Sequence, residues 1–161
     1  MQDRSALWII LPLLVLFPIA FAAIWVAVTA LISVTGGWRA LARRYAGTPS
    51  TVWDRVGGGS GMFSRGFLPT NYNGVLNVTA GPEGVGLSLW GLFRAGSEPL
   101  LIPWDEISSA GSDHFLGLIP RFWFVTLEPR VTISIIGRAG RMLARHWDEV
   151  QDRAALAPAG R

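Results

Sequence analysis

An uncharged apolar run near the N-terminus constrains this chain more than any other feature. From Ala6 to Val34 no residue is charged, and only Thr29 and Ser33 carry hydroxyl groups. A helix needs about 20 apolar residues to cross a hydrocarbon core of about 30 Å, so residues 1–35 are predicted to form a transmembrane anchor. Tilt or interfacial ends are expected to absorb the excess length. The side chains expected within the membrane are those of Leu7, Ile10, Leu14, Phe17, Phe21, Ile24, Val28 and Leu31.

A cleaved signal peptide is the alternative interpretation of this run. Ala20-Phe21-Ala22 imitates the small-x-small cleavage site of such peptides. Their apolar region, however, is about 7 to 15 residues long, whereas here the apolar residues continue past that site through Ile24 and Leu31. The longer run favours a retained anchor, and hence a single-pass membrane protein.

The two ends of the run differ in positive charge. Arg4 stands alone at the N-terminal end, while Arg39, Arg43 and Arg44 follow the C-terminal end closely. Positively charged residues flanking a span stay preferentially on the cytoplasmic side. The N-terminus is therefore expected outside, and the C-terminal domain in the cytoplasm.

A short amphipathic segment is predicted over residues 36–47. Trp38, Leu41 and Tyr45 recur at the spacing of one helix face, and arginines occupy another. Trp and Tyr favour the headgroup level, where Arg can meet anionic lipid. The alternative is a frayed continuation of the spanning helix, since so short a helix is marginal alone. The predicted membrane-interface residues are Trp38, Arg39, Arg43, Arg44 and Tyr45.

Residues 48–65 are rich in glycine. The run Gly57-Gly58-Gly59-Ser60-Gly61 has the composition of a flexible linker, so a linker is predicted between the membrane segment and a domain over residues 66–155. No lysine follows the glycines, which argues against a phosphate-binding loop. Residues 156–161 are predicted to be a disordered tail.

Beyond the linker, apolar and polar residues alternate as they do in half-buried strands. The clearest strand pair, 76–80 with 85–89, is joined at Gly81-Pro82-Glu83-Gly84, a sequence that suits a type I turn. Another pair, 122–127 with 131–136, is joined at Glu128-Pro129-Arg130. From Ala139 the apolar period becomes helical. The predicted fold class is therefore α+β and mostly β: one transmembrane helix, then six or seven antiparallel strands closed by a C-terminal helix.

No catalytic or metal-binding constellation is found, so a non-enzymatic protein without cofactor or metal is predicted. The chain has no Cys, and all 14 basic residues are Arg, which excludes thiolate metal sites and lysine Schiff bases. His114 and His146 show no zinc-ligand spacing, and His146 lies on the apolar arc of the last helix, as a packed core residue would. The net charge of +3 is scattered rather than clustered, which argues against nucleic acid as a partner.

Two groups of side chains are candidates for contact with a partner or with lipid. The first is an apolar segment between two strands, formed by Phe115, Leu116, Leu118 and Ile119. It is either an exposed contact patch or part of the core, folded over the mouth of the barrel. The second is the basic side of the C-terminal helix, formed by Arg138, Arg141 and Arg145. It either faces a phosphate or acidic partner, or is simply solvated.

Three stretches carry a resemblance to a known family. Asn71–Leu76, Gly84–Leu89 and Pro99–Ile107, the last with its Ile102 and Ile107 spacing, resemble small uncharacterised bacterial single-pass membrane proteins with a PH/GRAM-like domain. The likeness covers roughly residues 66–154 and implies a PH-like barrel at the face of the bacterial inner (cytoplasmic) membrane. Phosphoinositide-binding relatives use clustered Lys and Arg in the loop between their first two strands, where this chain has Glu83 and no base.

The predicted function is that of a membrane-anchored, non-enzymatic binding or scaffold module. Its PH-like domain is expected to contact the lipid bilayer or an unidentified protein partner. An accessory subunit of a membrane complex, assembled through the anchor, is one alternative, because a stripe of small residues suits helix packing in membranes. An enzyme of unknown class is the other, although converging titratable residues are lacking. The small-residue stripe consists of Ala20, Ala23, Ala27 and Ala30.

Overall fold

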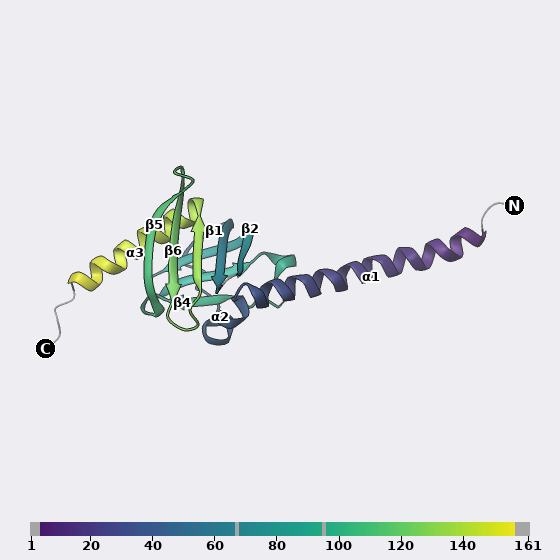
Figure 1. The fold of residues 1–161 in the computed structure, drawn as a ribbon, viewed down its shortest axis with the longest axis horizontal. Coiled ribbons are helices and arrows are strands. Elements are labelled where there is room, and N and C mark those ends of the chain that lie inside the picture. Colours follow the sequence, from purple (N-terminus) through teal and green to yellow (C-terminus); the bar gives the residue numbers. More distant parts are fainter. Residues whose placement is uncertain (1–3, 67, 95, 157–161) are drawn as a thin grey trace.

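The computed structural model describes residues 4–66, 68–94 and 96–156, with side chains from Pro12 onward except at positions 35 and 68. A long N-terminal helix projects from a curled sheet, and a second long helix lies across that sheet (Figure 1). The elements in chain order are α1 (Arg4–Thr35), α2 (Trp38–Tyr45), β1 (Asp54–Arg65), β2 (Leu68–Gly81), β3 (Gly84–Leu89), η1 (Gly91–Phe93), β4 (Leu100–Pro103), η2 (Trp104–Glu106), β5 (Ile107–Phe115), β6 (Ile119–Thr126), β7 (Thr132–Ile136) and α3 (Gly137–Leu156).

Helix α1 contains the apolar run that the sequence singles out. Its 23 residues Pro12–Val34 are long and apolar enough to cross a membrane, judged by length and composition. Leu7 and Ile10 lie outside the residues whose side chains are described. The other predicted membrane-facing side chains are all exposed, namely Leu14, Phe17, Phe21, Ile24, Val28 and Leu31.

The seven strands form one antiparallel sheet in the order β4-β3-β2-β1-β7-β6-β5. Strands β4 and β5 are its two edges, yet only the three residues of η2 connect them. Three residues span about 10 Å at most, so the sheet has to curl until its edges approach each other. The predicted number of strands is confirmed, and so are the hairpin at Gly81–Gly84 and the pairing of β6 with β7.

The glycine-rich segment departs most from expectation. Residues 54–65 form β1, which pairs with β2 on one side and β7 on the other, so the prediction of a linker is wrong for these residues. Gly61 gives the physical reason, because a Cβ there would lie 2.7 Å from Ile135 Cδ1 and 3.1 Å from Leu76 Cδ2. Glycine at this position permits close packing rather than flexibility.

Helix α2 is the predicted amphipathic helix, separated from α1 by Gly36 and Gly37 rather than continuing it. Its apolar face packs into the domain. Trp38 is 0% exposed and lies 5.2 Å from the Phe63 ring centroid, and Tyr45 is also buried. The prediction that Trp38 and Tyr45 lie at the membrane interface is therefore wrong, because the sheet, and not lipid, covers them.

Helix α3 is the predicted C-terminal helix and covers one open side of the curled sheet (Figure 1). Leu143 and Met142 are buried against the strands. Gly140 allows the close approach, since a Cβ there would lie 2.5 Å from the carbonyl oxygen of Ile135. The helix extends to Leu156, so the predicted tail begins one residue too early, and residues 157–161 lie outside the described part of the chain.

Candidate functional site

The two predicted contact groups lie next to each other. A hollow of about 620 Å³ lies between the β5–β6 hairpin and α3. Among its lining residues are Leu118 and Pro120 from the hairpin and Arg141, Arg145 and Asp148 from the helix. Leu118 of the hairpin tip and Arg141 and Arg145 of the helix thus line the same hollow. We call the two contact groups together the hairpin–helix surface, which consists of Phe115, Leu116, Leu118, Ile119, Arg138, Arg141 and Arg145.

The hairpin tip is exposed. Leu116 and Leu118 are 80% and 84% exposed, and Phe115 and Ile119, which pair across the strands, are less so. The alternative in which this segment folds over the barrel mouth as core is therefore wrong. Leu116 also adopts a φ of +52°, a left-handed conformation that costs an L-residue roughly 1–2 kcal/mol.

A bidentate ion pair holds the two strands together below the tip. Arg121 Nε donates to Asp113 Oδ1 at 2.7 Å, and Arg121 Nη2 donates to the other carboxylate oxygen at 2.5 Å. These hydrogen bonds hold the pKa of Asp113 below its ordinary value and raise that of Arg121. Because the pair joins residues directly opposite each other, it fixes the direction in which the tip projects.

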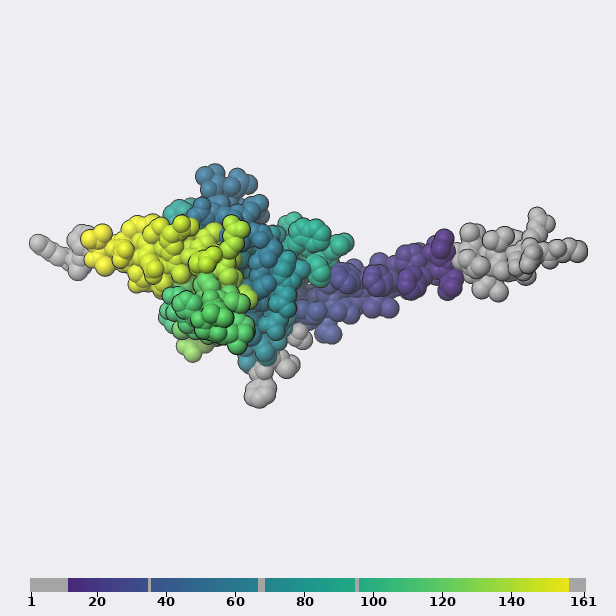
Figure 2. Space-filling view, turned by 90° about the horizontal axis from the view of Figure 1, so that it is seen from above, coloured from purple at the N-terminus to yellow at the C-terminus, as the bar shows by residue number. Residues whose placement is uncertain are grey.

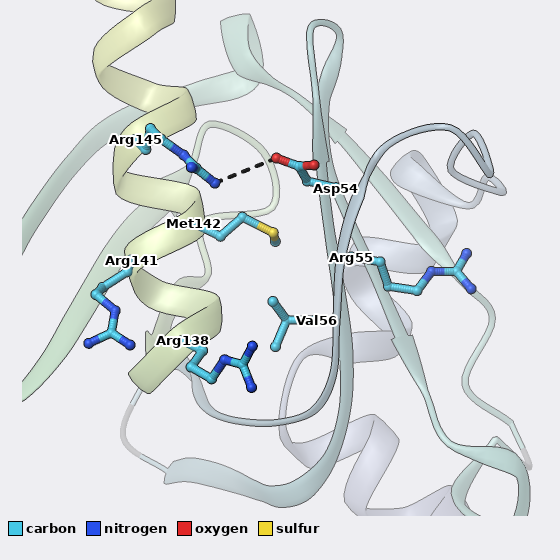
Figure 3. A pocket seen from close by; sticks show the side chains of 7 residues that line it. All are labelled: Asp54, Arg55, Val56, Arg138, Arg141, Met142 and Arg145. Carbon is cyan, nitrogen blue, oxygen red and sulfur yellow. Dashed lines mark ion pairs between the residues drawn. The ribbon is translucent and has the colours of Figure 1, made fainter.

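The basic side of α3 borders a second, open hollow of about 530 Å³ (Figure 3). Four arginines and one aspartate line it, giving an excess of positive charge. Arg145 Nη2 lies 3.6 Å from Asp54 Oδ2, and Figure 3 shows these two side chains pointing toward each other. For Arg138 and Arg141, no carboxylate of the described residues lies within ion-pair distance. The four arginines are Arg55, Arg138, Arg141 and Arg145.

Asp54 also pairs with His146, a contact that sequence reasoning missed. His146 Nε2 lies 3.0 Å from Asp54 Oδ2, and its side chain is 16% exposed. The expectation of a packed core residue is therefore only partly right, because the ring lies at the edge of the core against a carboxylate. Ninety-two residues separate the two positions, so no local pattern could have revealed the contact.

A third polar cluster joins α2 to η2. Arg44 Nη2 donates to Glu106 Oε1 at 2.7 Å, and the Tyr45 hydroxyl lies 3.0 Å from Glu106 Oε2 and 2.8 Å from the Glu128 carbonyl oxygen. Hydrogen bonds from Arg44 and Tyr45 lower the pKa of Glu106. Arg44 is thus bound to the domain's own carboxylate, whereas Arg39 and Arg43 are exposed without an ion pair to any described residue.

The hairpin–helix surface presents cationic guanidinium groups beside apolar side chains, a combination that suits an acidic, partly apolar ligand. Within the described residues, no group of three His, Cys, Asp or Glu side chains could hold a metal ion. The chain matches no known family model, no curated protein and no solved structure.

Proposed function

We propose that this chain is a membrane-anchored binding module with a PH-like barrel, which holds a protein partner beside the membrane through the hairpin–helix surface. The observation that carries the proposal is an exposed apolar hairpin tip whose Leu118 lines one hollow with Arg141, a guanidinium that has no ion pair with any described residue. Exposed apolar side chains bordered by charge are typical of interaction sites, and the positive charge selects a partner segment that carries Asp or Glu.

The direction of the tip favours protein over lipid as the occupant. In Figure 1 the β5–β6 hairpin projects sideways from the line of α1. With α1 crossing a bilayer, the tip would point along the membrane plane rather than into it. A partner standing next to the domain can reach it there, whereas the bilayer surface itself cannot.

Crosslinking in cells tests this function. A benzophenone amino acid at Leu118 is expected to form an adduct with a protein, and the double substitution of Arg138→Glu with Arg141→Glu is expected to abolish that adduct. The matched control is the same benzophenone at Val52, which is 91% exposed but lies outside the hairpin–helix surface. An adduct that survives the charge reversal, or equal adducts from both positions, would contradict the proposal.

We further propose that α1 is retained as a single-pass anchor in a bacterial inner membrane, with its N-terminus outside and the domain in the cytoplasm. Arg39, Arg43 and Arg44, which follow α1 and are all exposed, support this orientation. The chain has no cysteine of its own, so a Gln151→Cys variant carries a single thiol on the exposed side of α3. An impermeant maleimide should label it only after cell lysis. Labelling of intact cells would overturn the orientation.

An accessory subunit assembled through the anchor is the second candidate. Ala20, Ala23 and Ala27 are exposed on α1, and small residues let helices approach closely in a membrane. Replacing these three alanines by Leu should disrupt such a complex and leave a simple tether unaffected. Loss of the Leu118 adduct in this variant would favour the accessory subunit.

A further inference from the structure

A short loop lies against the C-terminal part of α1 and carries exposed apolar side chains. It comprises residues 90–94, and we call it the Trp90 loop. Trp90 and Leu92 are 59% and 66% exposed. Figures 1 and 2 show this loop, in teal, beside α1 at the side of the domain that faces the N-terminus.

Three polar contacts fix the loop and the residues that follow it. The indole Nε1 of Trp25 donates to the carbonyl oxygen of Leu92 at 3.2 Å, and Ser33 Oγ donates to that of Gly96 at 3.1 Å. Trp38 Nε1 donates to the carbonyl oxygen of Glu98 at 2.9 Å. Leu92 and Gly96 therefore lie alongside α1, at Trp25 and Ser33, two positions about 12 Å apart along the helix.

A tilted aromatic contact reinforces the first hydrogen bond. The rings of Trp25 and Phe93 lie 5.3 Å apart between centroids. Trp25 is half-buried, whereas the residues from Pro12 to Ile24 that precede it are exposed. Among the residues of α1 whose side chains are described, Trp25 is thus the first, counted from the N-terminus, that the domain partly covers.

This contact sets where the hydrocarbon of a membrane can begin. A lipid-exposed irregular loop cannot lie in hydrocarbon, because its backbone groups would lack water. With α1 crossing a bilayer, the loop, and Trp25 with it, therefore lies outside the hydrocarbon core. From Ala6 to Ile24 about 19 residues remain, which span about 28 Å as a helix and match the hydrocarbon thickness.

We propose that the Trp90 loop is a second membrane contact, which inserts Trp90 and Leu92 into the headgroup layer of the bilayer that α1 crosses. The proposal rests on the membrane anchoring put forward above. Trp side chains favour this layer, and Arg94, which is exposed at the end of the loop, can meet lipid phosphate there. The part of the apolar run that exceeds the hydrocarbon thickness then lies between the hydrocarbon and the domain, in the helical turns that follow Trp25.

A second contact has a defined mechanical role. A domain attached through a single helix can tilt relative to the membrane when the helix tilts. The loop adds a second attachment beside the helix axis, which limits this tilt and keeps one face of the domain toward the lipid. The hairpin–helix surface is thereby held at a constant height above the membrane.

Depth-dependent quenching tests the proposal on the full-length protein in phosphatidylcholine vesicles. A polarity-sensitive fluorophore is attached to Leu92→Cys, and the vesicles contain lipids with a nitroxide either near the headgroup or near the end of the acyl chain. We expect a blue-shifted emission that is quenched mainly by the nitroxide near the headgroup. Gln151→Cys, on exposed α3, is the matched control and should lose little emission.

A third labelled variant, Phe17→Cys, separates this proposal from the anchoring on which it rests. Phe17 lies about 12 Å deeper than Trp25 along α1 and should be quenched mainly from the end of the acyl chain. Quenching at Phe17 with none at Leu92 above the Gln151 control would overturn the loop contact alone. Stronger quenching of Leu92 by the deep nitroxide would overturn its interfacial level. No quenching at Phe17 would overturn the anchoring itself.

Discussion

Replacing Trp38 by Ala tests whether α2 belongs to the domain core or to the membrane surface. The indole is fully buried, makes tilted ring contacts with Phe63 and Tyr72, and donates to the Glu98 carbonyl oxygen. Removing a buried Trp side chain in this way costs about 3–5 kcal/mol. For a domain of this size, such a loss lowers Tm by roughly 10–20 °C.

Pulse proteolysis in urea, applied to the full-length protein in a mild detergent, measures the free energy of unfolding of the domain. Trp38→Phe keeps most of the ring contacts and loses the hydrogen bond, so we expect a smaller loss of about 1–3 kcal/mol. Arg39→Ala, at the exposed neighbouring position, is the matched control and should change stability by less than about 0.5 kcal/mol. If Trp38→Ala behaved like Arg39→Ala, the burial would be refuted and Trp38 would return to the headgroup level.

Three further predictions concern the domain. Gly61→Val is expected to lower the free energy of unfolding by about 1–3 kcal/mol, because the new side chain would overlap Ile135 and Leu76; Gly91→Ala, with no atom within 4 Å of the added Cβ, should be neutral. Leu116→Gly should leave stability unchanged or raise it by about 1 kcal/mol in thermal melts, since it relieves a positive φ at an exposed site; loss of folding would restore the core interpretation of the tip. The pKa values of Glu106 and Asp113 are lowered in the folded state, so these carboxyl groups bind fewer protons in the folded than in the unfolded protein. The stabilisation that they provide is therefore present above their ordinary pKa values of 4.5 and 3.8. It is lost as the pH falls further. Melts from pH 7 downward should show this loss, and Glu106→Gln should reduce it; an unchanged pH dependence in that variant would contradict the role of its ion pair with Arg44.

Local signals made much of the fold predictable. The hairpin at Gly81–Gly84 follows from turn residues set between alternating strands, and α3 follows from its helical apolar period. Such signals arise from residues that are neighbours in sequence, so the structures they predict do not depend on how distant parts of the chain pack. The apolar span of α1 is visible in the sequence for the same reason.

Non-local packing explains what could not be predicted. At Gly61, β1 has room for a hydrogen only, because Ile135 and Leu76 occupy the space beside it, and a composition rule cannot distinguish that from flexibility. The apolar face of α2 has the same pattern whether lipid or a sheet covers it. In the candidate site, the residue types were predictable, but the exposure of the tip and its proximity to the arginines depend on how β5, β6 and α3 meet.

Because Trp38 is buried directly after α1, the connection between the helix and the domain is too short to move freely. Only Gly36 and Gly37 separate the last residue of α1 from a side chain at the centre of the domain. A connection of this kind transmits torque, so any rotation of α1 about its axis, or displacement along that axis, would move the whole domain with it. A partner bound at the hairpin–helix surface would then move together with α1.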